Sequence, residues 1–351
     1  MSLGIYRPQR NWGTRVREVS YKGMRLIEME NESLRVGVLA GKGTDVIEFN
    51  FKPQDLDFAW LTAGGVQNTG GNMRTNPDPV GTFTDTYPGC WQEVFPNGGL
   101  PSTFDGAEFG QHAEISHLPW DVAIVADSEH EVAIRFTVRT FKSPYLVEKT
   151  LRLVAGEPTL FVEETITNES DVPVRAMWGH HLAYGRPFLD ETSRITVPDG
   201  LTLFTHPDAG ERRVVDGGRW PWPMAEGMHD GTVDLSAMPP RGEVSEMMYL
   251  EGFRDEAWYE VHHTGRATGF RVEWDPTVMP FLWYWMEYGG GGGYPWYGRH
   301  YNIGLEPFSS WSSGGLAAAV ENGTALSFAP RERKDFWLRC RVMADDSSGG
   351  K

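Results

Sequence analysis

The chain has 351 residues and a formal net charge of −16 at pH 7. It is long enough to bury a large core, and its two cysteines, Cys90 and Cys340, cannot alone form a disulfide framework or a metal cluster. Nucleic acid and anionic membranes are disfavoured as partners, because both require a basic surface. No membrane span or signal peptide is apparent, so we expect a cytoplasmic protein.

The composition is rich in turn-forming and aromatic residues. The chain contains 41 Gly and 23 Pro, together with 14 Trp, 12 Tyr and 18 Phe. Gly and Pro normally make up only about 12% of a chain, so this excess predicts many short elements joined by turns. The aromatic rings suit either an apolar core or the faces of sugar rings, and composition alone leaves both open.

Hydrophobic residues recur with a period of two, which indicates β-strands. Residues 34–39 and 45–51 flank a Gly-containing turn and predict a hairpin. In the segment 131–139, Val132, Ile134 and Phe136 alternate with polar or small residues, as expected for a half-buried strand. Short polar turns separate four such segments, and we therefore predict consecutive antiparallel strands over residues 121–126, 131–139, 145–153 and 159–167.

Two further strands are predicted near the C-terminus, at 324–329 and 335–342. We find no internal repeat, linker or long amphipathic helix. The sequence therefore predicts an all-β fold with one domain over residues 1–344, built from sandwiched sheets, and a disordered polar tail over residues 345–351. Irregular regions as long as 64–118 and 204–230 are usually functional or disordered, and their aromatic content favours ordered, packed loops.

Adjacent histidines, His180 and His181, lie near the end of a predicted strand. Neighbouring side chains on a strand point to opposite faces, so at most one of the two can enter a given cleft. The same geometry weakens a metal-site interpretation, because two ligands on one face would be spaced i, i+2. The alternative is a pair of histidines with only a packing or surface role.

Glu306 lies in the apolar stretch Ile303–Pro307. Burying a carboxylate is costly unless the group is paired or functional. Partial burial would raise its pKa toward the range of a general base. The alternative is a structural glutamate that is bonded to the backbone or to an arginine such as Arg299.

A third group of candidates lies in the loop 88–99 and the segment after it. Trp91, Gln92 and Glu93 combine an aromatic ring with polar groups, which suits a ligand rich in hydroxyl groups, and His112 follows. A structural loop anchored by the tryptophan is the alternative interpretation.

Other common chemistries find no support in the sequence. The glycine run at 289–293 lacks the Lys and the following helix of a phosphate-binding loop, so we expect a turning loop at the mouth of a site. No Gly-x-Ser-x-Gly motif predicts a serine hydrolase. The remaining histidines, including His262 and His263, show no metal-ligand spacing, and we expect neither a metal nor an organic cofactor.

Taken in order, these stretches resemble the aldose 1-epimerase (galactose mutarotase-like) family. The similarity spans about residues 34–342 and suggests a divergent branch. Its motifs are WQEVFPNGG, QHAEISHLPW, the strand series ending in WGHHLAYG, IGLEP and the terminal LSFAPRERKDFWLRCRV, which resembles the closing hairpin of the family.

The resemblance implies a galactose mutarotase-like β-supersandwich of antiparallel sheets, with the site on a concave sheet surface. It also implies a carbohydrate isomerase that interconverts the α and β anomers of a free aldose or related sugar. A glutamate takes the proton of the anomeric hydroxyl and a histidine protonates the ring oxygen. Glu306 matches the base, His181 matches the acid, and His112 matches a second histidine that holds the substrate.

Several family positions have no clear counterpart. His180 stands where Asn is usual, and either Arg74 or Gln92 is a candidate for the substrate-binding Arg. We add Trp91, His180 and Arg299 as further substrate-binding candidates. The aromatic residues beside the motifs are expected to line the cleft; they are Trp91, Trp178, Trp296 and Tyr297.

A neutral sugar is the expected partner, because Lys and Arg do not cluster near the motifs as a sugar phosphate would require. Two alternatives stay open. In the first, the chain is a non-catalytic sugar-binding protein that keeps the cleft and its aromatic residues. In the second, the same scaffold serves another reaction, such as a lyase or a different sugar isomerisation. The sequence does not identify the sugar or the oligomeric state.

Overall fold

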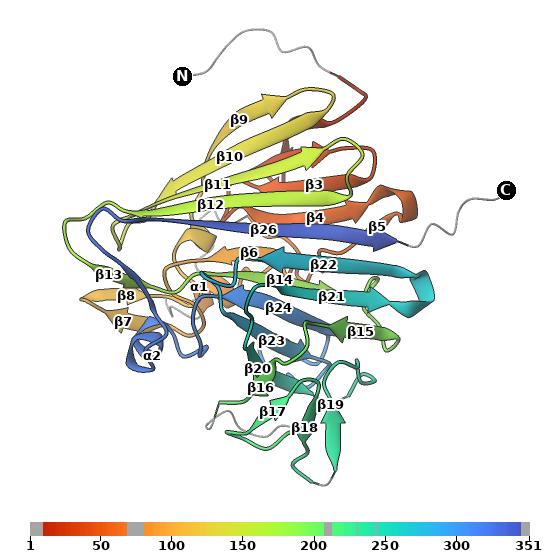
Figure 1. The fold of residues 1–351 in the computed structure, drawn as a ribbon. Helices are drawn as coiled ribbons and strands as arrows, with labels where there is room; N and C mark the ends of the chain where they lie inside the picture. The colour runs from red at the N-terminus through yellow and green to blue at the C-terminus, as the bar shows by residue number, and fades with distance from the viewer. Residues whose placement is uncertain (1–9, 69–80, 207–212, 230, 243, 345–351) are drawn as a thin grey trace, which may run out of the picture.

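The computed structural model describes residues 10–68, 81–206, 213–229, 231–242 and 244–344. Two large sheets of antiparallel strands dominate this part of the chain (Figure 1). The first contains twelve described strands, of which β5 (Leu56–Asp57) pairs only with β4. The other eleven follow in spatial order: β1 (Arg15–Tyr21), β2 (Met24–Glu30), β3 (Leu34–Leu39), β4 (Asp45–Phe51), β6 (Trp91–Val94), β14 (Gly179–Gly185), β24 (Asn302–Phe308), β23 (Phe281–Glu287), β20 (Ser245–Glu251), β16 (Thr202–Phe204) and β17 (Arg219–Pro221).

The second sheet contains eight described strands, several of them longer than those of the first. Its spatial order is β15 (Ser193–Thr196), β21 (Ala257–His263), β22 (Thr268–Trp274), β26 (Arg333–Ala344), β12 (Thr159–Asn168), β11 (Tyr145–Val154), β10 (Glu131–Arg139) and β9 (Asp121–Asp127). The remaining strands form two-stranded ribbons, namely β7 (Ser102–Phe104) with β8 (Ala107–Phe109), β13 (Val174–Ala176) with β25 (Leu326–Phe328), and β18 (Met224–Glu226) with β19 (Thr232–Asp234).

Helical structure is sparse in the described residues. Two short α-helices, α1 (Gly81–Thr84) and α2 (Leu316–Glu321), lie in connecting segments. Three single 3₁₀ turns complete the elements, at Lys52–Gln54, Ile115–His117 and Thr264–Arg266. The period-two pattern therefore predicted the fold class correctly.

The predicted strand series is confirmed in detail. Strands β9 to β12 follow one another along the chain and pair antiparallel in that order. The hairpin expected around residues 40–43 is formed by β3 and β4. Local alternation and turn residues suffice here, because each strand pairs with its neighbour in sequence.

The predicted closing hairpin is wrong. Strands β25 and β26 do form near the expected residues, but they do not pair with each other. Instead, β25 pairs with β13, and β26 inserts between β12 and β22. Both partners of β26 are distant in the sequence, and alternation within a segment carries no information about such partners.

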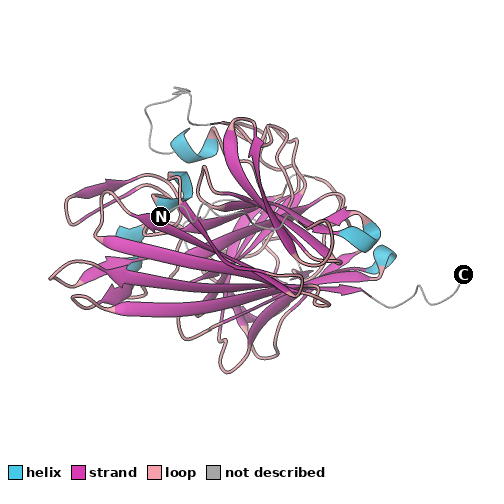
Figure 2. Ribbon diagram, turned by 90° about the horizontal axis from the view of Figure 1, so that it is seen from above, coloured by secondary structure: helices cyan, strands magenta, loops and turns pink. Residues whose placement is uncertain are grey.

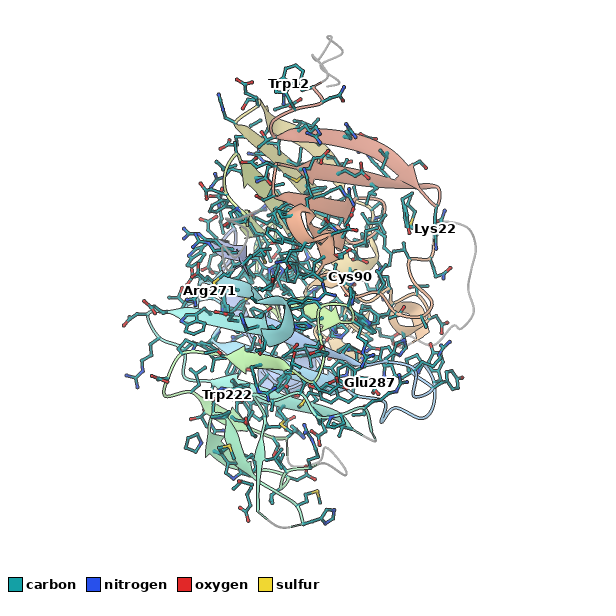
Figure 3. All side chains as sticks on the ribbon, turned by 90° about the vertical axis from the view of Figure 1, so that its right-hand side faces the viewer. Trp12, Lys22, Cys90, Trp222, Arg271 and Glu287 are labelled. Atoms are coloured by element: carbon teal, nitrogen blue, oxygen red, sulfur yellow. The ribbon has the colours of Figure 1, made fainter. Side chains whose placement is uncertain are left out.

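The main core lies between the two large sheets, which stack one over the other (Figure 2). Phe49 of the first sheet packs edge-on against Phe270 of the second, with ring centroids 4.9 Å apart. In β11, buried residues alternate regularly with partly exposed ones, so one face of the second sheet meets this core and the other meets solvent. Both cysteines are buried and unpaired, and Figure 3 shows Cys90 deep inside the molecule.

The central strands of the first sheet are covered on both faces. Every residue of β14 and of β24 is buried. One face meets the second sheet, while the other, which we call the site face, is covered by the segments around α1, β7, β8 and α2. The side chains on the site face are therefore largely buried.

Candidate active site

Strands β14, β24 and β23 lie side by side and bring the two predicted catalytic residues together. Gly179 lies opposite Phe308 and Ala183 lies opposite Gly304, and the same register places His181 directly across from Glu306. On the other side of β24, Trp283 lies directly opposite Glu306. Opposed residues on antiparallel strands project from the same face, so all three side chains share the site face.

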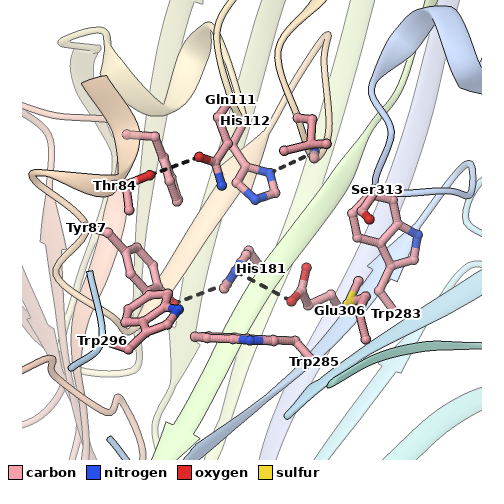
Figure 4. A pocket seen from close by; sticks show the side chains of 14 residues that line it. Thr84, Tyr87, Gln111, His112, His181, Trp283, Trp285, Trp296, Glu306 and Ser313 are labelled. Carbon is pink, nitrogen blue, oxygen red and sulfur yellow. Dashed lines mark hydrogen bonds and ion pairs between the residues drawn. The ribbon is translucent and has the colours of Figure 1, made fainter. Parts of the chain in front are cut away.

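A cavity of about 270 Å³ opens above these residues (Figure 4). This volume lies just below the usual range of ligand pockets, about 300–1,000 Å³, which suits a ligand as small as a monosaccharide. The described residues that line it are Phe83, Thr84, Tyr87, Gly99, Leu100, Gln111, His112, His181, Met247, Trp283, Trp285, Trp296, Glu306 and Ser313.

His181 and Glu306 form a close, buried pair. Nε2 of His181 is 3.5 Å from Oε1 of Glu306, while Oε2 of Glu306 has no hydrogen-bond partner among the described residues. Burial lowers the pKa of His181 to about 4 and raises the pKa of Glu306 well above its ordinary value. Both shifts favour the neutral forms of the two side chains, in which the pair holds one proton, on Glu306, and such a pair is able both to accept and to donate a proton.

His112 lies beside this pair, and the hydrogen bonding around its ring fixes its tautomer. The backbone N–H of Gly99 donates to Nδ1 of His112 at 3.2 Å, so Nδ1 carries no proton. Burial lowers the pKa of His112 well below its ordinary value, and the neutral ring therefore carries its proton on Nε2. The backbone of His112 has a φ of +48°, which is rare for a residue other than glycine and is often found at functional sites.

Aromatic rings form a large part of the remaining wall. The rings of Trp285 and Trp296 lie 5.3 Å apart, and Tyr87 approaches each of them edge-on. A few neutral polar groups complete the lining, including Thr84, whose hydroxyl donates to Oε1 of Gln111 at 2.9 Å. Among the described lining residues there is no Lys or Arg, and Glu306 is the only carboxylate.

Two of the predicted substrate-binding residues, Trp91 and His180, point away from the cavity. Strand alternation places both on the opposite face from His181, where they are buried between the two large sheets. There Nε1 of Trp91 donates to Nδ1 of His180 at 3.1 Å, and Nε2 of His180 lies 3.0 Å from Oε2 of Glu164. The expectation that the two histidines face opposite sides of the sheet is confirmed.

The remaining polar candidates do not line the described cavity either. Gln92 shares the site face with His181, but its side-chain amide donates to the carbonyl of Gly89 at 2.6 Å and is fully buried. Arg299 is exposed and lies over the ring of Tyr297 rather than near Glu306. Arg74 lies outside the described residues.

The aromatic residues expected to line the cleft divide into two groups. Trp296 lines the cavity, as expected. Trp178 and Trp91 do not, because both are buried in the core, where Trp178 packs on Phe336. Tyr297 is 59% exposed and lies outside the described lining. Closeness in sequence to a site residue was therefore a poor guide, since adjacent strand residues face opposite sides.

Sequence reasoning missed Tyr87, Trp283 and Trp285. A signal for the two tryptophans was present, since their i, i+2 spacing in the segment 281–287 places them on one face of a strand. Tyr87 offered no comparable signal. It lies in an irregular segment, and its position depends on the path of that loop across the sheet.

No cluster of three or more His, Cys, Asp or Glu side chains arranged to hold a metal ion is found among the described residues. In the same part of the chain, no helix has the length and apolar character needed to span a membrane.

Solved structures with the same architecture are numerous but distant in sequence. One is a "putative aldose 1-epimerase" from Klebsiella pneumoniae, with a TM-score of 0.69 and 15% identity over 95% of this chain and 88% of that one. A galactose mutarotase related enzyme from Lactobacillus acidophilus has a TM-score of 0.62 and 13% identity, covering 91% and 98% of the two chains. A galactose mutarotase-like protein from Lactobacillus casei has a TM-score of 0.61 and 16% identity, covering 91% and 100%.

These similarities show that the chain has the galactose mutarotase-like β-sandwich fold, as the sequence motifs predicted. At such low identity they establish the fold alone. The chain belongs to the family described as "Domain of unknown function (DUF4432)", whose model matches residues 21–342. No curated protein matches the chain.

Proposed function

We propose that this protein is an aldose 1-epimerase-like enzyme that interconverts the anomers of a neutral monosaccharide. The observation that carries the proposal is the buried pair of His181 and Glu306, 3.5 Å apart at the floor of a monosaccharide-sized cavity. The aromatic walls suit the apolar faces of a sugar ring, and the neutral polar groups suit its hydroxyls. Names of structural relatives support the same class of reaction.

The reaction needs two proton transfers and one bond rotation. In the proposed mechanism, ionised Glu306 takes the proton of the anomeric hydroxyl while protonated His181 gives its Nε2 proton to the ring oxygen. The ring opens to the aldehyde, the C1–C2 bond rotates, and the reverse transfers close the ring as the other anomer. His112, with its proton on Nε2, donates a hydrogen bond to a sugar oxygen.

The substrate also favours the charged form of the pair. In the empty site, burial disfavours both the carboxylate and the imidazolium. Sugar hydroxyls placed against them supply hydrogen bonds that partly replace lost water, and this stabilises the ionised state in which the proposed base and acid are ready.

Anomer exchange measured by NMR on a panel of neutral aldoses tests the proposal. We expect Glu306→Gln and His181→Asn each to lower the catalysed rate by at least about 100-fold, the usual contribution of one acid–base group. Glu321→Gln, at an exposed position on α2, and His262→Asn, on β21, are controls that should retain the full rate. If sugars bind but the wild type does not accelerate exchange, the protein is a binding protein and the enzymatic proposal fails.

A further inference from the structure

The second ring nitrogen of His181, Nδ1, has a partner that takes no part in the proposed proton transfers. Nε2 faces Glu306, while Nδ1 lies 3.4 Å from the hydroxyl oxygen of Tyr87 (Figure 4). Tyr87 lines the cavity and is 6% exposed. Its ring meets the imidazole edge-on, with centroids 5.3 Å apart.

The position of the proton on the His181 ring determines the role of this partner. In the proposed reaction the proton of His181 is lost and regained at Nε2, the nitrogen on the side of Glu306. A neutral imidazole keeps one proton, so Nδ1 must stay protonated while Nε2 is bare. The partner of Nδ1 must then be an acceptor throughout the cycle.

Tyr87 is suited to accept this hydrogen bond. Burial raises the pKa of Tyr87 well above its ordinary value, so its oxygen remains a hydroxyl and does not compete with His181 for the proton. The ring stacks on Phe83, with centroids 5.2 Å apart, and meets Trp285 and Trp296 edge-on. These contacts restrict the ring and hold its oxygen beside Nδ1.

The hydroxyl proton of Tyr87 is then available to a ligand. When the oxygen accepts from Nδ1, its own proton needs another acceptor. Among the described residues, His181 is the only one with which this hydroxyl forms a hydrogen bond. The residue lines the cavity, so an oxygen of a bound sugar is the acceptor within reach. The Tyr87 hydroxyl would thus accept a hydrogen bond from Nδ1 of His181 and donate one to the bound sugar.

We propose that Tyr87 is a positioning residue, which holds the Nδ1 proton of His181 and directs the exchangeable proton to Nε2, facing Glu306 and the substrate. This inference rests on the proposed anomer exchange for its catalytic meaning. The claim that Tyr87 fixes the tautomer of His181 can be tested whether or not any sugar reacts.

The tautomer is measured directly by NMR of the protein labelled with ¹⁵N-histidine, with the His181 signals assigned from their loss in His181→Asn. At neutral pH we expect wild-type His181 to carry its neutral-state proton on Nδ1. Tyr87→Phe, which keeps the ring but removes the hydroxyl, should shift the population toward the Nε2–H tautomer. Tyr21→Phe, on the distant strand β1, is the matched control and should leave the His181 signals unchanged.

Kinetics provide the second readout. For a sugar that the wild type converts, Tyr87→Phe should lower kcat about 5- to 10-fold, the usual effect of one lost hydrogen bond, with a smaller rise in KM. A wild-type His181 protonated mainly on Nε2, or a tautomer population unaffected by Tyr87→Phe, would overturn the proposal. If Tyr87→Phe does not fold, the tautomer of His181 in the wild type still tests the proposal. Absence of exchange with every sugar, alongside the expected tautomer, would instead refute the proposed function.

Discussion

Glu306 is held in place by a glycine two residues earlier on the same strand. A methyl group added at Gly304 would lie 2.5 Å from Oε1 of Glu306 and 3.2 Å from the ring of Trp285. The carboxylate therefore folds back over the space that Gly304 leaves open. The position of the proposed base depends on this missing side chain as well as on its own strand.

Replacing Gly304 by Ala should therefore displace the carboxylate while the strand persists. We expect the rate of anomer exchange to fall about 100-fold, the usual cost of moving a catalytic group by about 1 Å. NMR exchange rates and thermal unfolding should be measured together. Gly242→Ala, where the nearest atom to the new methyl would be 3.7 Å away, is the control. Full activity in Gly304→Ala would show that the position of the carboxylate is unimportant.

At this scale the sequence identified three residues that line one cavity, Glu306, His181 and His112, because each lies in a motif with chemical character. Their roles remain proposals. Tyr87 was not predictable, since its contact with His181 joins two segments 94 positions apart. Trp91 and Trp178 were expected to line the cleft but lie in the core, because proximity in sequence does not reveal which face of a sheet a side chain occupies.

Among the elements, β14 is joined to the second sheet by a buried polar chain behind the site. Trp91 donates to His180, His180 contacts Glu164, and Lys149 pairs with Glu93 at 2.8 Å. Because the Trp91 indole is only a donor, Nδ1 of His180 is bare and its proton lies on Nε2, facing Glu164. Burial lowers the pKa of His180 to about 3, which agrees with a neutral ring.

Glu164 makes this chain sensitive to pH. Burial raises its pKa from 4.5 to about 7, so the folded protein binds a proton that the unfolded chain releases between these values. The resulting contribution to stability is fully present below about pH 4.5 and is lost as the pH rises through about 7. The total change for an isolated group with this shift is about 3 kcal/mol.

Glu164→Gln should remove this dependence while keeping an acceptor for His180. We expect the variant to gain stability relative to the wild type as the pH rises from 5 to 8, by up to about 3 kcal/mol. Urea unfolding of both proteins at several pH values measures the difference, to which Glu93 also contributes, because its pKa is raised by burial and by the charge of Glu164. A difference that does not change with pH would mean that Glu164 is ionised throughout this range.

The strands themselves were predictable where pairing is local. Strands β9 to β12 follow from alternation and polar turns, whereas the position of β26 between β12 and β22 does not. Its neighbours are chosen by burial of its apolar face against strands far away in the chain. This is a property of the assembled sandwich rather than of residues 333–344.

For the molecule as a whole, the negative charge bears on which ligands the proposed site accepts. The chain carries a net charge of −16, and the described lining of the cavity contains Glu306 but neither Lys nor Arg. An anionic group brought into this cavity would be desolvated beside a carboxylate without a compensating cation. Both observations favour neutral ligands.

We therefore predict that uronic acids and sugar phosphates are poor substrates. Their kcat/KM should lie at least about 100-fold below that of the best neutral aldose, which corresponds to about 3 kcal/mol of lost transition-state binding. Competition experiments with matched pairs, such as a hexose and its 6-phosphate, measure the ratio. Preference for the phosphate would contradict this prediction.

Exchange NMR on the wild type and Glu306→Gln, side by side with a neutral aldose in weakly catalytic buffer, tests the central claim most directly. The account predicts rapid magnetisation transfer between the α and β anomeric protons with the wild type, and only the spontaneous rate with the variant. Equal rates for the two proteins, whether fast or slow, would contradict the assignment of this site as an aldose 1-epimerase centre.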